Sequence, residues 1–161
     1  MNWMILPYRR YFDFGGRSRR KEYWLFFLFW VLLAVAMAIG VFVMIAGRLQ
    51  GLMQGGASML NGMGVTVGLL FGLFGLLFLG SLIPMIAVQV RRLHDLGVSG
   101  WWYLAYIVAG GIAGQVPDVG ESVNSLVSLG WIVWMCMPGT KGGNRFGDDP
   151  KNPVTTAEIF A

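Results

Sequence analysis

Charged residues are scarce in this chain of 161 residues, where they make up 12% of the composition against 56% for hydrophobic residues. Soluble domains carry about 25% charged residues, and so little charge cannot cover the surface of a water-soluble sphere of this size. The single cysteine, Cys136, excludes a disulfide scaffold, and the many apolar residues exclude a disordered chain. The composition therefore predicts a single membrane domain over residues 1–161, with the lipid bilayer as its solvent.

Four uncharged apolar stretches follow one another along the chain. The first two, residues 23–46 and 63–90, are long enough to cross the hydrocarbon core of about 30 Å as helices. The last two, residues 101–116 and 123–138, would reach only about 22–24 Å as helices and are joined by a turn at 117–122. We expect an all-α membrane protein with four transmembrane helices, of which the last two form either short spans or a re-entrant hairpin.

The polar segments between these stretches divide the basic residues unequally. The N-terminal segment 1–22, the loop 91–100 and the tail 139–161 hold eleven of the twelve lysines and arginines. The remaining loop, residues 47–62, is rich in glycine and methionine and holds only Arg48. This distribution follows the positive-inside rule, so we expect a multi-pass protein with both termini in the cytoplasm and the 47–62 loop outside.

Three glycines recur at four-residue spacing in the second stretch, at Gly64, Gly68 and Gly72. This spacing puts them on one helical face, where another backbone can approach closely. We expect packing against a helix of the same chain, with a homo-oligomer as the alternative. None of the four stretches contains Asp, Glu, Lys, Arg or His, which disfavours an ion-coupled carrier because carriers place ionisable groups within the bundle.

Three polar motifs fall on the predicted cytoplasmic side: residues 14–24 (FGGRSRRKEYW), 91–102 (RRLHDLGVSGWW) and 138–150 (PGTKGGNRFGDDP). In the second motif, Gly97 suits the position just after a helix C-terminus, and Ser99 can cap the following helix. We expect the three motifs to assemble into one structure at the membrane surface, which we call the cap.

The cap contains five candidate anion-binding arginines, Arg17, Arg20, Arg91, Arg92 and Arg145. Guanidinium groups suit phosphate, so the cap would bind an anionic lipid headgroup or a phosphate-bearing small molecule. The alternative makes these arginines topology anchors, with the other motif residues holding the cap together. Those structural candidates are Glu22, Trp24, His94, Asp95, Ser99, Trp101, Asn144 and Phe146.

Two further predictions concern the second motif. Arg91 and Asp95 are four residues apart, so on a helix they can pair. A catalytic interpretation would use His94 as general base with Asp95 or Glu22 as its orienting partner. Adjacent helix residues point about 100° apart, however, so Asp95 is poorly placed for this role. No nucleophile motif, metal-ligand cluster or cofactor fingerprint accompanies His94, so we expect no enzyme, no cofactor and no metal. The orientation of the protein in the membrane accounts for where the basic residues lie, so we expect no nucleic-acid partner.

Together the three motifs resemble those of the DUF805 family of small bacterial inner-membrane proteins. The family's hallmarks are similar to F-x-G-R-x-x-R-x-E-[FY]-W, R-R-L-H-D with S-G-W-W after it, and G-x-x-G-x-N-R-F-G-x-D-P, and the match runs from Phe14 to Pro150. The resemblance implies an inner-membrane protein of about four helices and no assigned activity. We expect a non-enzymatic scaffold or interaction protein, and the alternative is an oligomeric small transport or channel component.

Overall fold

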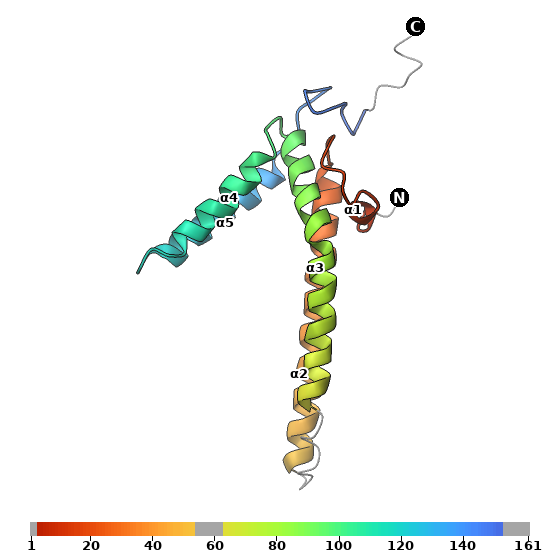
Figure 1. The fold of residues 1–161 in the computed structure, drawn as a ribbon, viewed down its shortest axis with the longest axis vertical. Helices are drawn as coiled ribbons and strands as arrows, with labels where there is room; N and C mark the ends of the chain where they lie inside the picture. Colours follow the sequence, from red (N-terminus) through yellow and green to blue (C-terminus); the bar gives the residue numbers. More distant parts are fainter. Residues whose placement is uncertain (1–2, 54–62, 153–161) are drawn as a thin grey trace. The chain divides into compact units, whose positions relative to one another are not determined.

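The computed structural model describes residues 3–53 and 63–152, and within them the chain is helical (Figure 1). Part of the predicted 47–62 loop, residues 54–62, and the end of the predicted tail, residues 153–161, lie outside the described residues. The helices are α1 (Leu6–Arg9), α2 (Arg20–Met53), α3 (Met63–Asp95), α4 (Trp101–Ala113) and α5 (Gly120–Cys136). The described residues contain no strand beyond one isolated bridge between Asn144 and Gly147.

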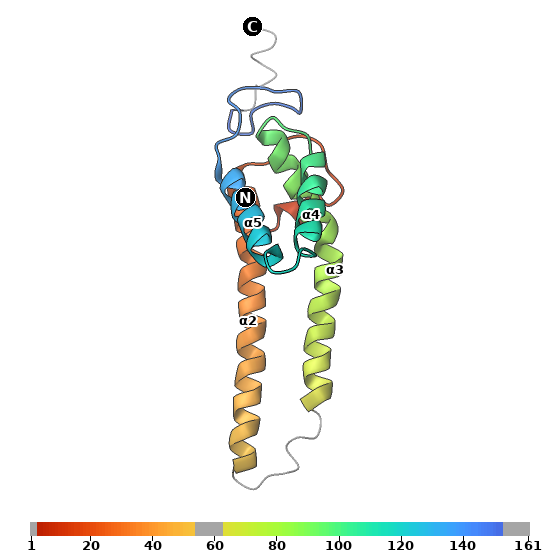
Figure 2. The same ribbon diagram turned by 90° about the vertical axis from the view of Figure 1, so that its left-hand side faces the viewer.

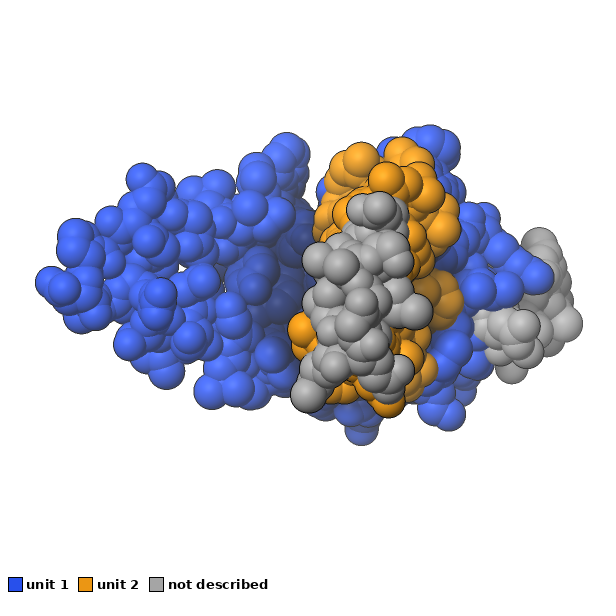
Figure 3. Space-filling view, turned by 90° about the horizontal axis from the view of Figure 1, so that it is seen from below, with its two compact units in different colours: residues 1–25, 83–161 blue, residues 26–82 orange. Residues whose placement is uncertain are grey.

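The chain divides into two compact units, which Figure 3 shows in different colours. One unit is residues 26–82, and the other combines residues 1–25 with residues 83–161. The second unit contains all three motifs, the N-terminal turn of α2, the last part of α3 and the whole of α4 and α5.

The unit of residues 26–82 consists of two long apolar helical segments. Trp30 of α2 is buried, and its ring meets Phe74 and Phe78 of α3 edge-on, with centroids 5.9 and 5.8 Å away. The helices provide two segments long and apolar enough to cross a membrane, Arg20–Gln50 and Gly64–Asp95. Only 6% and 11% of their most apolar parts are buried, whereas the core helix of a soluble protein would be mostly buried. Their exposed apolar surface matches a lipid environment.

The glycine face of α3 has open space beside it. A Cβ atom added at Gly64, Gly68 or Gly72 would meet nothing within 4 Å, so the described residues do not provide the intrachain packing that the sequence led us to expect. In this unit the large rings around Trp30 make the contacts between α2 and α3 instead.

The helices do not end where the apolar stretches end. Helix α2 continues seven residues beyond the predicted boundary at residue 46, and α3 continues five residues beyond residue 90, through the RRLHD segment. Helix α4 stops at Ala113, three residues before its predicted end. Hydropathy marks where lipid contact ends, but backbone hydrogen bonding continues through good helix formers such as Arg, Leu, Gln and Met.

Helices α4 and α5 form an antiparallel hairpin (Figures 1 and 2). Aromatic rings join them: Tyr106 stacks on Trp131 with centroids 4.3 Å apart, and Trp102 meets Trp134 edge-on at 5.9 Å. Gly120 begins α5 at a point where a Cβ would lie 2.5 Å from the Ala113 carbonyl oxygen, so the tight turn requires glycine there. The 13 residues of α4 and the 17 of α5 correspond to about 20 and 25 Å of helix.

Candidate functional site

A Schellman motif at the end of α3 shapes the second motif. Gly97 has a φ of +83°, and its amide donates to the His94 carbonyl at 3.0 Å, while the Val98 amide donates to the Leu93 carbonyl at 3.1 Å. The prediction for Gly97 is therefore confirmed. The prediction that Ser99 caps α4 is wrong, because Gly100 occupies the N-cap position. The Ser99 hydroxyl only reaches the Trp101 amide, at the long distance of 3.5 Å.

Arg91 joins the first two motifs. Its side chain is 0% exposed, and its Nη2 donates to the Glu22 Oε1 at 2.9 Å. Its Nη1 donates to the carbonyl oxygens of Arg10, at 3.3 Å, and Asp13. The predicted pair of Arg91 with Asp95 is wrong, because the first turn of α2 brings a carboxylate closer to Arg91 than its own helix does.

The Asp95 carboxylate is shared by two other arginines. Arg17 Nε donates to its Oδ1 at 3.0 Å, and Arg92 Nη1 donates to its Oδ2. Arg92 also donates to the Met135 carbonyl, at 3.3 Å from Nε and 3.1 Å from Nη2, and to the Met137 carbonyl. Through Asp95 the cap therefore connects the N-terminal segment and the end of α3, and through Arg92 it reaches the end of α5.

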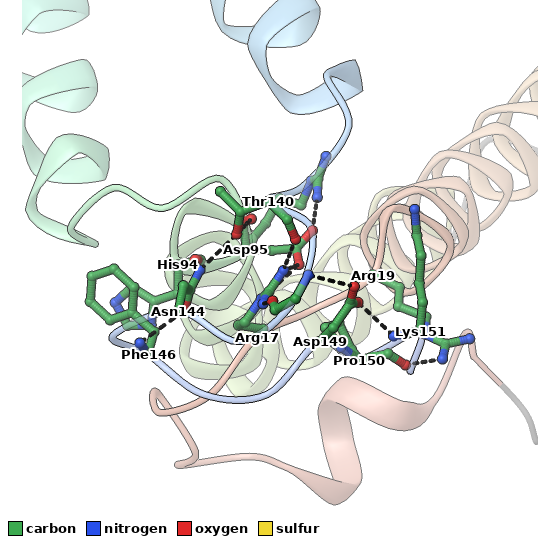
Figure 4. Close-up of polar contacts among 12 residues, drawn as sticks. Arg17, Arg19, His94, Asp95, Thr140, Asn144, Phe146, Asp149, Pro150 and Lys151 are labelled. Atoms are coloured by element: carbon green, nitrogen blue, oxygen red, sulfur yellow. Dashed lines mark hydrogen bonds and ion pairs between the residues drawn. The ribbon is translucent and has the colours of Figure 1, made fainter. Parts of the chain in front are cut away.

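The third motif closes over this cluster (Figure 4). Arg17 Nη2 and Nη1 donate to the carbonyl oxygens of Thr140 and Gly142, each at 2.5 Å. The Thr140 amide donates to the Asp95 carbonyl at 2.8 Å. A Cβ at Gly139 would collide with the Asp95 Oδ2, so only glycine lets this backbone lie against the carboxylate.

His94 is built into the same structure as a packing residue. Its ring stacks on Phe146 with centroids 4.0 Å apart and an interplanar angle of 6°. Its Nδ1 is 3.2 Å from the Gly16 carbonyl oxygen, and its own carbonyl accepts from Asn144 Nδ2 at 2.9 Å. The carboxylates that a catalytic histidine would need, Glu22 and Asp95, bind arginines instead.

The remaining predicted residues lie at the surface of the cap. Arg20 Nη1 donates to the Cys136 carbonyl at 3.2 Å, and the exposed Arg145 guanidinium lies 4.7 Å from the centroid of the Phe146 ring. Trp24 is half-buried and meets Tyr23 edge-on at 5.2 Å. Trp101 is 76% exposed and takes no part in the buried network.

The five predicted anion-binding arginines therefore do not converge on one open site. Arg17, Arg91 and Arg92 are buried and bind Glu22, Asp95 and backbone carbonyls, while Arg20 and Arg145 lie apart at the surface. Three guanidinium groups face two carboxylates, and backbone carbonyl oxygens accept further N–H donors from all three arginines. A buried charge that loses its partner costs about 3–5 kcal/mol, so this cluster locks the three motifs together.

Two carboxylates outside the spans were not anticipated from the sequence. Burial would raise the pKa of Asp13, but the hydrogen bond and charge of Arg10 and the Gly15 amide outweigh it and lower that pKa. The amides of Lys151, at 2.9 Å, and Gly142, at 3.3 Å, donate to the Asp149 carboxylate, and the Lys151 bond is the main cause of its lowered pKa.

Among residues 3–53 and 63–152, no group of three His, Cys, Asp or Glu side chains lies close enough to hold a metal ion.

Two long helices with exposed apolar surfaces, joined to a cap held by buried arginines, are typical of a helical membrane protein. The profile of the family described as "Protein of unknown function (DUF805)" matches residues 11–148, and the chain belongs to this family. It is 33% identical over 151 residues to Inner membrane protein YhaH of Escherichia coli K12, covering 94% of this chain and 98% of YhaH. It is 31% identical over 151 residues to Inner membrane protein YhaI of the same strain, covering 94% of this chain and 97% of YhaI. No solved structure gives a significant match.

Proposed function

We propose that the protein is a non-enzymatic interaction protein of the bacterial inner membrane, and that its cap is a rigid platform for a partner. The observation that carries this proposal is the closure of the motifs on one another: Arg17, Arg91 and Arg92 donate to carboxylates and carbonyls of the chain itself. A catalytic centre needs polar groups open to a substrate, and here those groups are used to hold three segments in place. The names of YhaH and YhaI support the inner-membrane location.

The topology that we propose has both termini in the cytoplasm and four spans. The unequal distribution of basic residues supports the orientation. Helices α4 and α5 fall short of the hydrocarbon thickness of about 30 Å, but Asp118 and Glu121 lie at the tip of their hairpin. An acidic residue at the bilayer centre costs about 2.5–3.5 kcal/mol, which favours a tip that reaches the far polar region through a locally thinned bilayer.

Cysteine labelling tests this topology. In a Cys136→Ser background, we expect Glu121→Cys to react with a membrane-impermeant maleimide in intact spheroplasts. The matched position Gly143→Cys, exposed in the cap, should react only after permeabilisation. A Glu121→Cys variant that reacts in neither preparation would establish the re-entrant hairpin, and labelling of Gly143→Cys in intact spheroplasts would reverse the orientation.

Site-specific photo-crosslinking in cells tests the interaction role. A photoreactive amino acid at exposed cap position Asp148 should give discrete crosslinked products, and the same residue at the hairpin tip, at Glu121, should not give those products. A cap position that yields no product under conditions where the protein is inserted would contradict the proposal. A His94→Ala variant that supports growth as well as the wild type would dismiss a histidine-dependent enzyme.

The exposed glycine face of α3 favours one alternative, an oligomeric transport or channel component. Gly64, Gly68 and Gly72 have open space where a second helix could approach. Because the apolar stretches hold no Asp, Glu, Lys, Arg or His, a conducting pathway would have to form between subunits. Ion or solute flux through liposomes containing the purified protein distinguishes this alternative from the interaction protein.

A further inference from the structure

A cavity of about 980 Å³ lies in the cap beside the first turn of α2. Four basic residues and two tryptophans dominate its lining: Arg19, Arg20, Lys21, Lys151, Trp3 and Trp24. Three of the four basic residues are consecutive at the start of α2, and the fourth comes from the C-terminal segment. The fold thus concentrates positive charge from both ends of the sequence around one hollow.

These cations differ from the buried arginines because most of their donors remain available. Arg19 donates one N–H to the Pro150 carbonyl, and Arg20 donates one to the Cys136 carbonyl at 3.2 Å. A guanidinium has five N–H donors, so these bonds orient each arginine and leave other donors for a ligand. The side chains of Lys21 and Lys151 are exposed.

The charge of the cavity is not neutralised by its one acidic residue. Asp95 lines the cavity, but its carboxylate already accepts from Arg17 and Arg92. The other charged residues of the lining are all cationic, and the Arg19 guanidinium lies 5.8 Å from the centroid of the Trp3 ring. Such a cation–π contact holds the guanidinium without using its N–H donors.

The cavity lies where the polar segment of α2 meets its apolar run. Trp24 and Leu25 line it, and the uncharged run begins at residue 23, so this is the depth of lipid headgroups. Tryptophan is enriched at this depth, and arginine binds phosphate oxygens through paired N–H donors. The volume falls in the range typical of small-molecule sites, about 300–1,000 Å³.

We infer that this cavity binds a phosphate group carried by an anionic ligand at the cytoplasmic membrane surface. The inference rests on the proposed cytoplasmic position of the cap. Its ligand is defined by chemistry: a negatively charged phosphate that pairs with Arg19 and Arg20, beside an uncharged part that contacts Trp3 and Trp24. An anionic phospholipid and a soluble phosphate ester both present this chemistry.

Native mass spectrometry of the full chain in detergent tests the inference. The protein is titrated separately with dioleoylphosphatidylglycerol, with dioleoylphosphatidylcholine of the same acyl chains, and with glycerol 3-phosphate. We expect either phosphatidylglycerol in preference to phosphatidylcholine, or glycerol 3-phosphate, to bind the wild type. Lipid retention identifies a headgroup site, and binding of glycerol 3-phosphate without lipid retention identifies a soluble ligand.

Two charge-matched variants locate the site. Lys21→Gln/Lys151→Gln removes two cavity charges whose ammonium groups make no hydrogen bond in the described structure, so the fold should persist. It should weaken binding about fivefold for each charge removed. Arg9→Gln/Lys141→Gln removes two exposed charges outside the cavity and should bind as the wild type does.

Equal losses in the two double variants, or no binding of any anionic ligand to the wild type, would overturn the inference. Thermal unfolding of each variant shows whether a loss of binding is a loss of folding. The maleimide-labelling experiment reports the cap's position independently. A correctly placed cap that binds no phosphate therefore refutes this inference alone, while a misplaced cap refutes the proposed topology.

Discussion

Arg91 and Glu22, 69 residues apart in the sequence, form a buried ion pair in which Arg91 Nη2 donates to Glu22 Oε1 at 2.9 Å. The pair joins the end of α3 to the first turn of α2. Because both side chains are at most 3% exposed, each group depends on the other for neutralisation. This contact is therefore one of those that couple the first motif to the second.

Removing one member of this pair should destabilise the protein strongly. Glu22→Ala leaves the Arg91 guanidinium buried without its carboxylate, which costs about 3–5 kcal/mol of unfolding free energy. The exposed pair of Arg10 and Asp13 is the control, and Asp13→Ala should cost about 0–1 kcal/mol. Unfolding in detergent, followed by tryptophan fluorescence, measures both. The double variant Glu22→Met/Arg91→Met should recover much of the loss, and a double variant less stable than Glu22→Ala would contradict this account.

Gly139 is required by its contact with Asp95. Gly139→Ala places a Cβ in collision with the Asp95 Oδ2, so the carboxylate must leave Arg92 or the third motif must shift. We expect a loss of about 3–5 kcal/mol, as for breaking a buried ion pair. Gly143→Ala is the matched control, because its Cβ would come no closer than 3.8 Å to Asp148. Similar unfolding curves for the two variants would show that the third motif can shift away from Asp95 with no loss of unfolding free energy.

Because the glycine face of α3 has open space beside it, we expect a larger side chain there to leave the stability of the monomer unchanged. Gly68→Ile adds atoms where the structure has open space, so it should leave the unfolding free energy within about 0.5 kcal/mol of the wild type. Gly120→Ala instead places a Cβ 2.5 Å from the Ala113 carbonyl and should destabilise the hairpin. If the face joins two copies, Gly68→Ile also reduces the mass measured by light scattering in detergent. If Gly68→Ile strongly destabilised a monomeric protein, the claim that the space beside this face is open would be contradicted.

The lowered pKa of Asp149 predicts a pH-dependent turn in the third motif. A carboxylate whose pKa is lowered by folding stabilises its turn at pH values above its ordinary pKa of 3.8. This stabilisation is lost as the pH falls through the lower pKa of the folded state. The amide resonances of Gly142 and Lys151 should therefore shift with a midpoint below 3.8. Asp149→Asn should abolish this titration, and a midpoint at or above the ordinary value would contradict the lowered pKa.

Much of the helical layout was predictable because lipid contact and helix ends have local signatures. The uncharged runs at 23–46 and 63–90 lie within α2 and α3, and Gly97 takes the positive φ that a Schellman motif requires. The helix ends were less predictable, because RRLHD is polar in composition yet continues α3 as far as Asp95. The sequence becomes polar at residue 91, but the helical backbone hydrogen bonds of α3 continue to Asp95.

The composition of the cap was also predictable, since the three motifs that resemble DUF805 meet in one unit of the structure. The pairing inside it was not. Helical spacing favoured Arg91 with Asp95, yet Arg91 binds Glu22, and Asp95 binds Arg17 and Arg92. The carbonyl oxygens of Thr140 and Met135 are acceptors in this network, and a backbone carbonyl has no signature in the sequence.

The sequence by itself determined that the chain is a helical membrane protein and which segments are long and apolar enough to cross a bilayer, because the free energy of transfer into a bilayer depends on local composition. Only the tertiary structure decided which arginines are buried and which surround an open cavity. Arg17, Arg20, Arg91 and Arg92 are chemically identical, and their roles diverge because burial next to a carboxylate commits a guanidinium to an internal partner. Arg20, on the exposed side of the same helix turn that holds Glu22, donates one N–H to the Cys136 carbonyl and lines the cavity.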